Sequence, residues 1–147
     1  MFYFPLVLTP DDNDTFLVTC PTLPEVTTFG ETREDALRYG AEAVEEAVAA
    51  RVAGWEDVPV PEDSEANRAA LAAGDFARLP LQATMKLLLF FACQKDSVTR
   101  AELARRMGVH REQVDRLFRF DHASRLDQID AAFQALNQSV NITLEAA

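Results

Sequence analysis

The residues with the clearest capacity for molecular recognition lie between positions 97 and 125. This stretch holds seven arginines and four acidic residues, a net charge of +3. Arginine and glutamine carry the hydrogen-bond donors that read base edges in the major groove of DNA. We therefore expect Arg111 and Gln113, and after them Arg116, to contact bases. The full set of residues expected at double-stranded DNA is Thr99, Arg100, His110, Arg111, Glu112, Gln113, Arg116 and Arg119.

Local signals place these side chains on two short helices joined by a turn. Thr99 and Glu102 have the spacing of a capping box, in which the hydroxyl accepts a first-turn N–H and the carboxylate reaches back to the cap. Gly108 supplies the backbone freedom that a sharp turn between helices needs. A second helix then begins at His110, which we expect to be a helix cap or an exposed residue. The apolar residues expected between the helices are Leu103, Ala104, Met107, Val109, Val114, Leu117 and Phe118.

This arrangement predicts the helix-turn-helix of DNA-binding proteins. Arg100 and Arg119 lie at the ends of the elements and are expected to contact phosphates. One such motif reads too few base pairs for useful specificity, so the chain is expected to bind DNA as a dimer or higher oligomer. The plain alternative is a helical pair whose charged face meets only solvent.

The net charge of −10 is distributed unevenly along the 147 residues. Residues 1–75 hold 16 acidic and 4 basic residues, a net charge of −12. Residues 76–147 hold 8 acidic and 10 basic residues, a net charge of +2. An acidic half joined to a mildly basic half predicts two partners of different charge.

Composition narrows the class of protein further. With 48% hydrophobic residues the chain can bury a core, and no apolar run reaches the length of a membrane span. The N-terminal residues lack the basic flank and cleavage site of a signal peptide. Cys20 and Cys93 lack CxxC spacing, so we expect reduced core cysteines in a cytoplasmic protein.

The first half has the pattern of a small α+β domain, residues 1–61. Residues 2–8, 15–20 and 26–29 are rich in branched and aromatic residues and predict three strands. Thr32 opens a long helix that Gly54 ends, and residues 58–61 can return as a fourth strand. The apolar stripe expected to lie on the sheet is Leu37, Ala41, Val44, Val48, Val52 and Trp55.

The second half has the pattern of an all-α domain of the phage-repressor type, residues 80–147. Residues 62–79 are small and charged and are interpreted as a linker, within which residues 66–73 could form a short helix. Residues 81–95 follow Pro80 and are apolar almost all round, which is typical of a central helix. Ser124 and Asp127 are expected to cap a last helix, and residues 140–144 alternate weakly and suggest a terminal strand.

Together the two halves resemble the HicB family of bacterial antitoxins. In the first half the resemblance rests on FYFPLVL, TFLVTCPTLPEVTTFGETREDAL and VPVPE, with Gly-x-Thr-x-x-x-Ala at the helix entrance. In the second half it rests on LPLQATMKLLLFFA, SVTRAELARRMGVHREQVDRLFRF and HASRLDQIDAAFQAL. Thr22 and Glu25 depart from the family pattern, in which an acidic residue and a glycine are common, so we expect the loop before Val26 to follow a different path.

The resemblance implies a partial ribonuclease-H-like first domain, of order β-β-β-α-β, that lacks that enzyme's catalytic set. It also implies a HicA-type toxin as partner, a small basic ribonuclease that cleaves messenger RNA, and repression of the chain's own operon. Opposite charges on the two proteins would speed their encounter. The acidic residues expected to face the toxin are Asp11, Asp12, Asp14, Glu34, Glu42, Glu45 and Glu46.

No catalytic residue, metal site or cofactor is expected, because no nucleophile constellation or Gly-rich phosphate loop is found. The only histidines are His110 and His122, both in the second half. One rival is a helix-turn-helix regulator whose acidic domain senses a small molecule. Another is a magnesium-dependent nuclease built on Asp11, Asp12, Asp14 and a helix glutamate, but three of these carboxylates crowd one loop.

Overall fold

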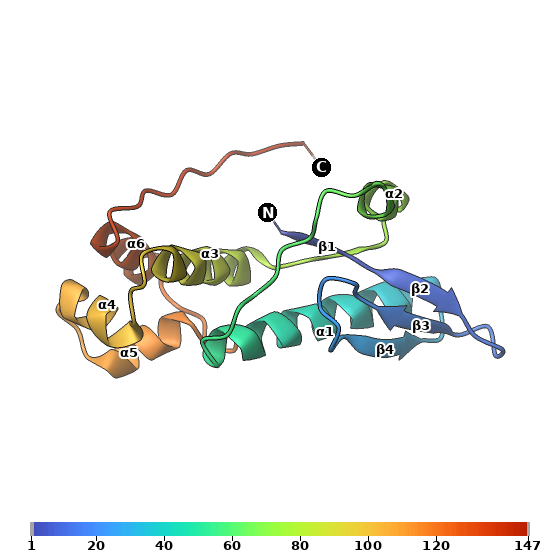
Figure 1. Cartoon of the computed structure of the whole chain (residues 1–147), viewed down its shortest axis with the longest axis horizontal. Coiled ribbons are helices and arrows are strands. Elements are labelled where there is room, and N and C mark those ends of the chain that lie inside the picture. The colour runs from blue at the N-terminus through green and yellow to red at the C-terminus, as the bar shows by residue number, and fades with distance from the viewer. Residues whose placement is uncertain (1, 147) are drawn as a thin grey trace. The chain divides into compact units, whose positions relative to one another are not determined.

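The computed structural model describes residues 2–146, and the chain divides into two compact units, residues 1–84 and 85–147. Figure 1 shows the elements along the chain. The first unit contains β1 (Tyr3–Pro5), β2 (Val7–Pro10), β3 (Phe16–Thr19), β4 (Thr27–Gly30), α1 (Arg33–Ala53), α2 (Glu65–Ala73) and β5 (Phe76–Arg78). Helix α3 (Leu81–Lys95) begins in the first unit and continues into the second, which also contains α4 (Arg100–Met107), α5 (Arg111–Leu117) and α6 (Leu126–Ala135). The expected α+β class is therefore confirmed at the level of strands followed by helices.

Strands β2, β3 and β4 form an antiparallel sheet that α1 covers on one face (Figure 1). Val44, Val48 and Val52 on α1 are fully buried, as the spacing predicted. The start of the stripe differs, because Ala36 and Gly40 are buried where Leu37 and Ala41 were expected. A Cβ atom at Gly40 would lie 2.8 Å from Cδ1 of Leu6 and 3.0 Å from Cγ1 of Val18 in β3, so glycine permits the close approach of helix and sheet.

Gly30, Thr32 and Ala36 together set the entrance of α1. The hydroxyl of Thr32 accepts the N–H of Asp35 at 3.0 Å, and its carbonyl accepts the N–H of Ala36 at 2.9 Å. A Cβ atom at Gly30 would lie 2.2 Å from the backbone nitrogen of Ala36. The Gly-x-Thr-x-x-x-Ala pattern therefore has a packing cause, since only glycine lets the end of β4 touch the first turn of α1.

Two predictions for the first half are wrong. The strand expected over residues 2–8 is divided into β1 and β2, which pair with different strands: β1 pairs with β5, and β2 pairs with β3. Residues 58–61 form no strand; the partner of β1 is instead β5, which lies inside the segment interpreted as a linker. The rings of Tyr3 and Phe76 lie edge to face with their centroids 5.1 Å apart. This contact joins residues far apart in the sequence, so local composition does not reveal it.

The same segment also contains α2, so residues 62–79 are largely folded. Ser64 caps this helix by accepting the N–H of Asn67 at 3.1 Å, and Gly74 ends it in the left-handed conformation. Trp55 was predicted to continue the apolar stripe of α1, but it follows the end of the helix and has a φ of 56°, so it does not belong to the stripe.

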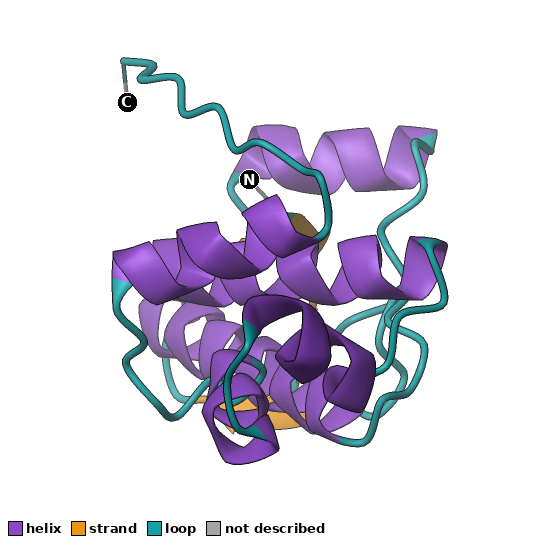
Figure 2. Ribbon diagram, turned by 90° about the vertical axis from the view of Figure 1, so that its left-hand side faces the viewer, coloured by secondary structure: helices purple, strands orange, loops and turns teal. Residues whose placement is uncertain are grey.

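The second unit is built from helices, and α3 has the predicted bounds. Leu87, Leu89 and Cys93 of α3 are fully buried. The terminal strand expected at residues 140–144 does not form, and Figure 2 draws the described part of the chain after α6 as a loop. Val140, Ile142 and Leu144 are exposed there, so alternation of apolar residues does not form a strand where no partner strand is available. In the described chain no helix combines the length and apolarity that crossing a membrane requires.

Candidate nucleic-acid interface

Helix α4 begins and ends as its sequence predicts. The hydroxyl of Thr99 accepts the N–H of Glu102 at 3.1 Å, which satisfies one of the unpaired donors of the first turn. Gly108 closes the helix in the left-handed conformation with a φ of 67°. The N–H of Val109 then donates to the carbonyl of Ala104 at 3.1 Å, and this turn leads directly into α5.

The carboxylate of Glu102 does not complete the predicted capping box. It accepts hydrogen bonds from Arg105 at 2.8 and 2.5 Å and from Arg106 at 3.0 Å. The hydrogen bonds from Arg105, and then the one from Arg106, lower the pKa of Glu102 to about 2. Two nearby guanidinium groups compete successfully for the carboxylate because each carries a full positive charge, so that both donor and acceptor are ionised, whereas a backbone N–H is a neutral donor.

Helix α5 starts with a hydrogen bond between His110 and Gln113. The backbone N–H of His110 donates to Oε1 of Gln113 at 3.0 Å, which agrees with a capping role for His110. The carboxamide oxygen of Gln113 is thus engaged at its own helix, while its NH2 group still offers donors. A bidentate contact to adenine needs both ends of the amide, so Gln113 is better suited to donate than to read adenine.

Apolar contacts fasten α4 and α5 together. Leu103 and Val114 are fully buried, and Ala104 is small enough to allow close packing between the helices. Leu117 and Phe118 are also buried, as predicted, and Val109 is half-buried. The side of α5 opposite these residues exposes the charged and polar side chains of Arg111, Glu112, Gln113 and Arg116.

Asp115 lies between two of the predicted DNA-binding arginines. Its Oδ1 atom is 3.9 Å from Nη1 of Arg100 and 3.8 Å from Nε of Arg111. Arg100 belongs to α4 and Arg111 to α5, so one carboxylate links the two helices. No sequence signal singles out Asp115, because it occupies an ordinary helical position.

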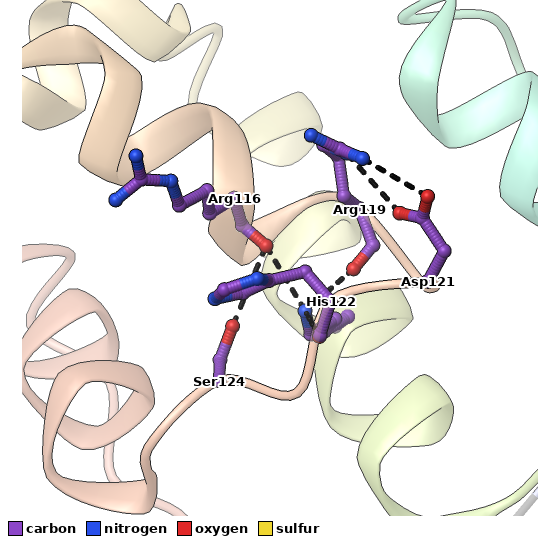
Figure 3. A network of polar contacts seen from close by, with 6 residues as sticks. Arg116, Arg119, Asp121, His122 and Ser124 are labelled. Atoms are coloured by element: carbon purple, nitrogen blue, oxygen red, sulfur yellow. Dashed lines mark hydrogen bonds and ion pairs between the residues drawn. The ribbon is translucent and has the colours of Figure 1, made fainter.

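Arg119 is held by a neighbouring carboxylate in the loop after α5. Its Nε and Nη2 atoms donate to Asp121 at 3.1 and 2.9 Å (Figure 3). The side chain of Arg116, by contrast, points away from this cluster in Figure 3. The structure therefore brings Arg111, Gln113 and Arg116 to the exposed side of one helix and places Arg119 beyond its end.

Lys86 of α3 is fully buried, and its ammonium group binds the backbone at the end of α5. The Nζ atom donates to the carbonyls of Arg116 at 3.0 Å, Arg119 at 2.6 Å and His122 at 2.6 Å. The carbonyls at a helix C-terminus carry partial negative charge, which favours a cation there. Burial nevertheless lowers the pKa of Lys86 to about 8.

The loop that Lys86 binds also carries Ser124. Its hydroxyl donates to the carbonyl of Arg116 at 3.4 Å, so Ser124 does not cap α6 as predicted. The residue at the start of α6 is instead Arg125, and its guanidinium pairs with Asp127 at 2.8 Å. Ser124 is buried and bound to the preceding helix, which is a tertiary contact that its position before a helix does not reveal.

A hollow of about 300 Å³ lies beside α5. We name it the basic hollow, because three of its six lining residues are Arg116, His122 and Arg125 and none is acidic. Its other lining residues are Gln113, Ala123 and Gln128. Sequence reasoning missed His122, Arg125 and Gln128, since only the fold brings the start of α6 next to α5.

The predicted toxin-facing residues all lie in the first unit. Asp11, Asp12 and Asp14 are exposed in the tight turn between β2 and β3, and Asp14 has a φ of 58°. Glu34, Glu42 and Glu46 are exposed on α1, while Glu45 is half-buried. The described residues contain no cluster of metal-ligating side chains.

The four arginines of the acidic half are all engaged by carboxylates of the same unit. The pairs are Arg33 with Asp75, Arg38 with Asp35, Arg51 with Glu25, and Arg68 with Asp63. The bond from Arg51 also lowers the pKa of Glu25 and ties the loop before Val26 to the end of α1, which accounts for glutamate at this position. The unit therefore presents an excess of carboxylates that its own cations do not neutralise.

Comparison with known proteins gives one consistent result. A family model described as the HicB-like antitoxin of a bacterial toxin–antitoxin system matches residues 3–88. The antitoxin HicB of Pseudomonas fluorescens is 33% identical over 147 residues, all of this chain and 97% of the relative. The antitoxin HicB of Escherichia coli K12 is 28% identical over 96% of this chain and 98% of its own length, and antitoxin HicB 1 of Photorhabdus laumondii is 28% identical over 97% and 86%.

Proposed function

The chain belongs to the family of HicB-like antitoxins of bacterial toxin–antitoxin systems, and from this premise we propose how its two units divide the work. The first unit binds a HicA-type toxin, a small basic ribonuclease, and covers its active site. The second unit binds operator DNA and represses the operon that encodes both proteins. Inhibition by occlusion needs no catalytic residue in the antitoxin.

The acidic surface of the first unit supports the toxin-binding role. Up to position 75 this unit holds 16 acidic residues against 4 arginines, each of which is engaged in an internal ion pair, and Arg78 adds one further positive charge before the unit ends at residue 84. A basic ribonuclease approaching this unit gains from the complementary potential, which raises the association rate and disfavours unrelated partners. The family model covers this unit completely from residue 3 onward.

The helical pair α4–α5 supports the DNA-binding role. A capped helix, a left-handed glycine and a second helix with a buried apolar side follow one another as in a helix-turn-helix. The exposed side of α5 carries Arg111 and Arg116, whose guanidinium groups suit guanine edges or phosphates. Two copies acting together would read two half-sites of an operator.

The segregation of charge is the observation that carries this proposal. A net charge of −12 up to residue 75 and of +2 beyond it lets one chain bind a cationic protein and a polyanion. A chain of uniform charge would gain electrostatically with only one of them.

Two measurements on the full chain test the proposal. Affinity capture from the source cells should return a stoichiometric basic protein encoded beside this chain, toxic alone and neutralised on co-expression. Titration with the upstream region of the operon should show tighter binding than scrambled duplex at moderate ionic strength. Capture of no such protein, with retained DNA preference, would favour the rival regulator that senses a small molecule.

A further inference from the structure

The basic hollow has the chemistry of an anion site. Arginine, histidine and glutamine side chains provide N–H donors on its walls, and a phosphodiester offers acceptor oxygens. Nη2 of Arg125 also donates to Asp127 at 2.8 Å, so a phosphate has to share this guanidinium group with that carboxylate. Arg116 comes from α5, Arg125 from the residue before α6, and His122 from the loop between them. A volume of about 300 Å³ is sufficient for one phosphate group.

The buried ammonium group of Lys86 forms hydrogen bonds with the backbone of residues that line the hollow. Two of the three carbonyls that Lys86 binds belong to Arg116 and His122, which both line the hollow. Ser124, between His122 and Arg125, donates to the same carbonyl of Arg116. The backbone on both sides of the hollow is therefore connected through the Arg116 carbonyl and the Lys86 ammonium.

Stability alone does not explain a lysine at this position. Burial disfavours the charged ammonium, as the lowered pKa of Lys86 indicates, and an apolar side chain of similar length would avoid that cost. An apolar side chain would, however, leave the three carbonyls without the donor that draws them together. The lysine is accounted for if the position of these carbonyls matters more than the cost of burying the charge.

We propose that the basic hollow is a binding site for a backbone phosphate of DNA, and that Lys86 is the positioning residue that holds its walls in place. The inference rests on the proposed DNA-binding function and adds residues to it: Arg125, His122 and Gln128 join Arg116 at the phosphate. None of the three lies on α5, so their contact extends the DNA-binding surface toward α6.

The first arm of the test removes one wall of the hollow. Arg125→Gln should weaken binding of the full chain to operator and scrambled duplex alike, by about five- to tenfold at 0.1 M salt. The slope of log affinity against log salt concentration should become shallower by about 1. Arg68→Gln is the matched control, because Arg68 is an exposed arginine paired with a nearby aspartate in the first unit, and it should change neither quantity.

The second arm uses the only two lysines of the chain, which lie on the same helix. Lys86→Met should lower DNA affinity about as much as Arg125→Gln, whereas Lys95→Met, at the exposed end of α3, should have little effect. The double variant Lys86→Met, Arg125→Gln should have the same DNA affinity as whichever single variant binds DNA less tightly, because both changes disable the same site. Fully additive losses, or a folded Lys86→Met variant that binds normally, would overturn the positioning role.

A third arm separates this inference from the proposed function. Inorganic phosphate, titrated into the wild-type chain without DNA, should shift the amide NMR signals of residues 122–128, and Arg125→Gln should abolish the shifts. If the chain has no DNA preference but these shifts occur, the anion site stands and the repressor role fails. Absence of the shifts, together with normal DNA binding by Arg125→Gln, would refute the proposal that the basic hollow binds phosphate. Should Lys86→Met fail to fold, Lys86→Gln, which keeps two N–H donors, takes its place.

Discussion

Asp121 holds the guanidinium group of Arg119 through two hydrogen bonds of 3.1 and 2.9 Å. A phosphate contact by Arg119 must therefore compete with a carboxylate two residues away. The paired carboxylate also lowers the local positive charge at the end of α5, because the pKa of Asp121 is lowered by the hydrogen bond from Arg119 and the group is ionised at neutral pH. On the proposed DNA-binding role, we therefore expect Asp121 to restrain the affinity of this surface for DNA.

Replacing Asp121 should strengthen DNA binding. Asp121→Asn keeps the shape of the side chain but releases Arg119, which should raise affinity for any duplex by up to about fivefold, in line with the 0.2–1 kcal/mol of an exposed ion pair. Fluorescence anisotropy at two salt concentrations measures the change. Asp63→Asn, which breaks the pair with Arg68 in the first unit, is the control and should have no effect. Equal affinities for wild type and Asp121→Asn would contradict the assignment of Arg119 to a phosphate.

Arg111 and Arg119 should differ in kind when each is replaced by alanine. Arg111→Ala should cost about 1–3 kcal/mol on the operator and relax the preference at one base-pair position. Arg119→Ala should weaken operator and random duplex equally and reduce the salt dependence. Competition titrations with single-base operator variants distinguish the two. Identical behaviour of both variants on both kinds of duplex means that the roles are misassigned.

Gly30→Ala should destabilise the first unit. Its new methyl group would lie 2.2 Å from the nitrogen and 2.4 Å from the Cα atom of Ala36, so the backbone of α1 has to move. We expect the free energy of unfolding, measured by urea denaturation, to fall by about 1–3 kcal/mol. Gly54→Ala provides the comparison, because Gly54 has a φ of −79° and its nearest neighbour is a flexible glutamate side chain. Similar losses for the two variants would show that the contact between β4 and α1 is not tight.

Cys93 should make stability depend on alkaline pH. Burial raises the pKa of its thiol to about 11 from 9.0, so between these values the unfolded chain loses the proton and the folded chain keeps it. The free energy of unfolding should therefore fall by up to about 3 kcal/mol from pH 9 to pH 11 on account of Cys93. Between about pH 8 and 10.5 the titration of Lys86 acts in the opposite direction and raises the free energy of unfolding as the pH rises. The quantity to measure is therefore the difference in this free energy between wild type and Cys93→Ala. A difference that does not vary with pH would exclude the shifted thiol.

Charge reversal should locate the toxin-binding surface. Glu42→Lys with Glu46→Lys changes the exposed face of α1, and Asp11→Lys with Asp12→Lys changes the β2–β3 turn. The double variant whose changed residues lie at the interface should associate with the toxin at least about tenfold more slowly than wild type at low salt. About 0.5 M salt should reduce this difference in rate from wild type. Stopped-flow mixing measures the rates. If neither pair slows association, the acidic surface does not guide the toxin, and the largely apolar groove of about 430 Å³ between residues 2–5 and α2 becomes the surface to test.

Local sequence signals determined the elements whose causes are themselves local. The caps at Thr32 and Thr99, the left-handed Gly108 and the helix over residues 81–95 follow from side chains within a few positions of one another. The split of charge between the halves, and the family pattern with glycine and alanine at positions 30 and 36, were likewise readable from the sequence alone.

Only the tertiary structure decided the contacts that join distant residues. The pairing of β1 with β5, the buried Lys86 beneath the end of α5 and the basic hollow each depend on groups brought together over 30 or more residues or across a loop. A composition rich in alanine and charge reads as a linker, and a lysine within an apolar helix reads as a solvated residue, until the burial of each is known. Strand pairing and burial depend on partners far along the chain, and local propensity carries no information about those partners.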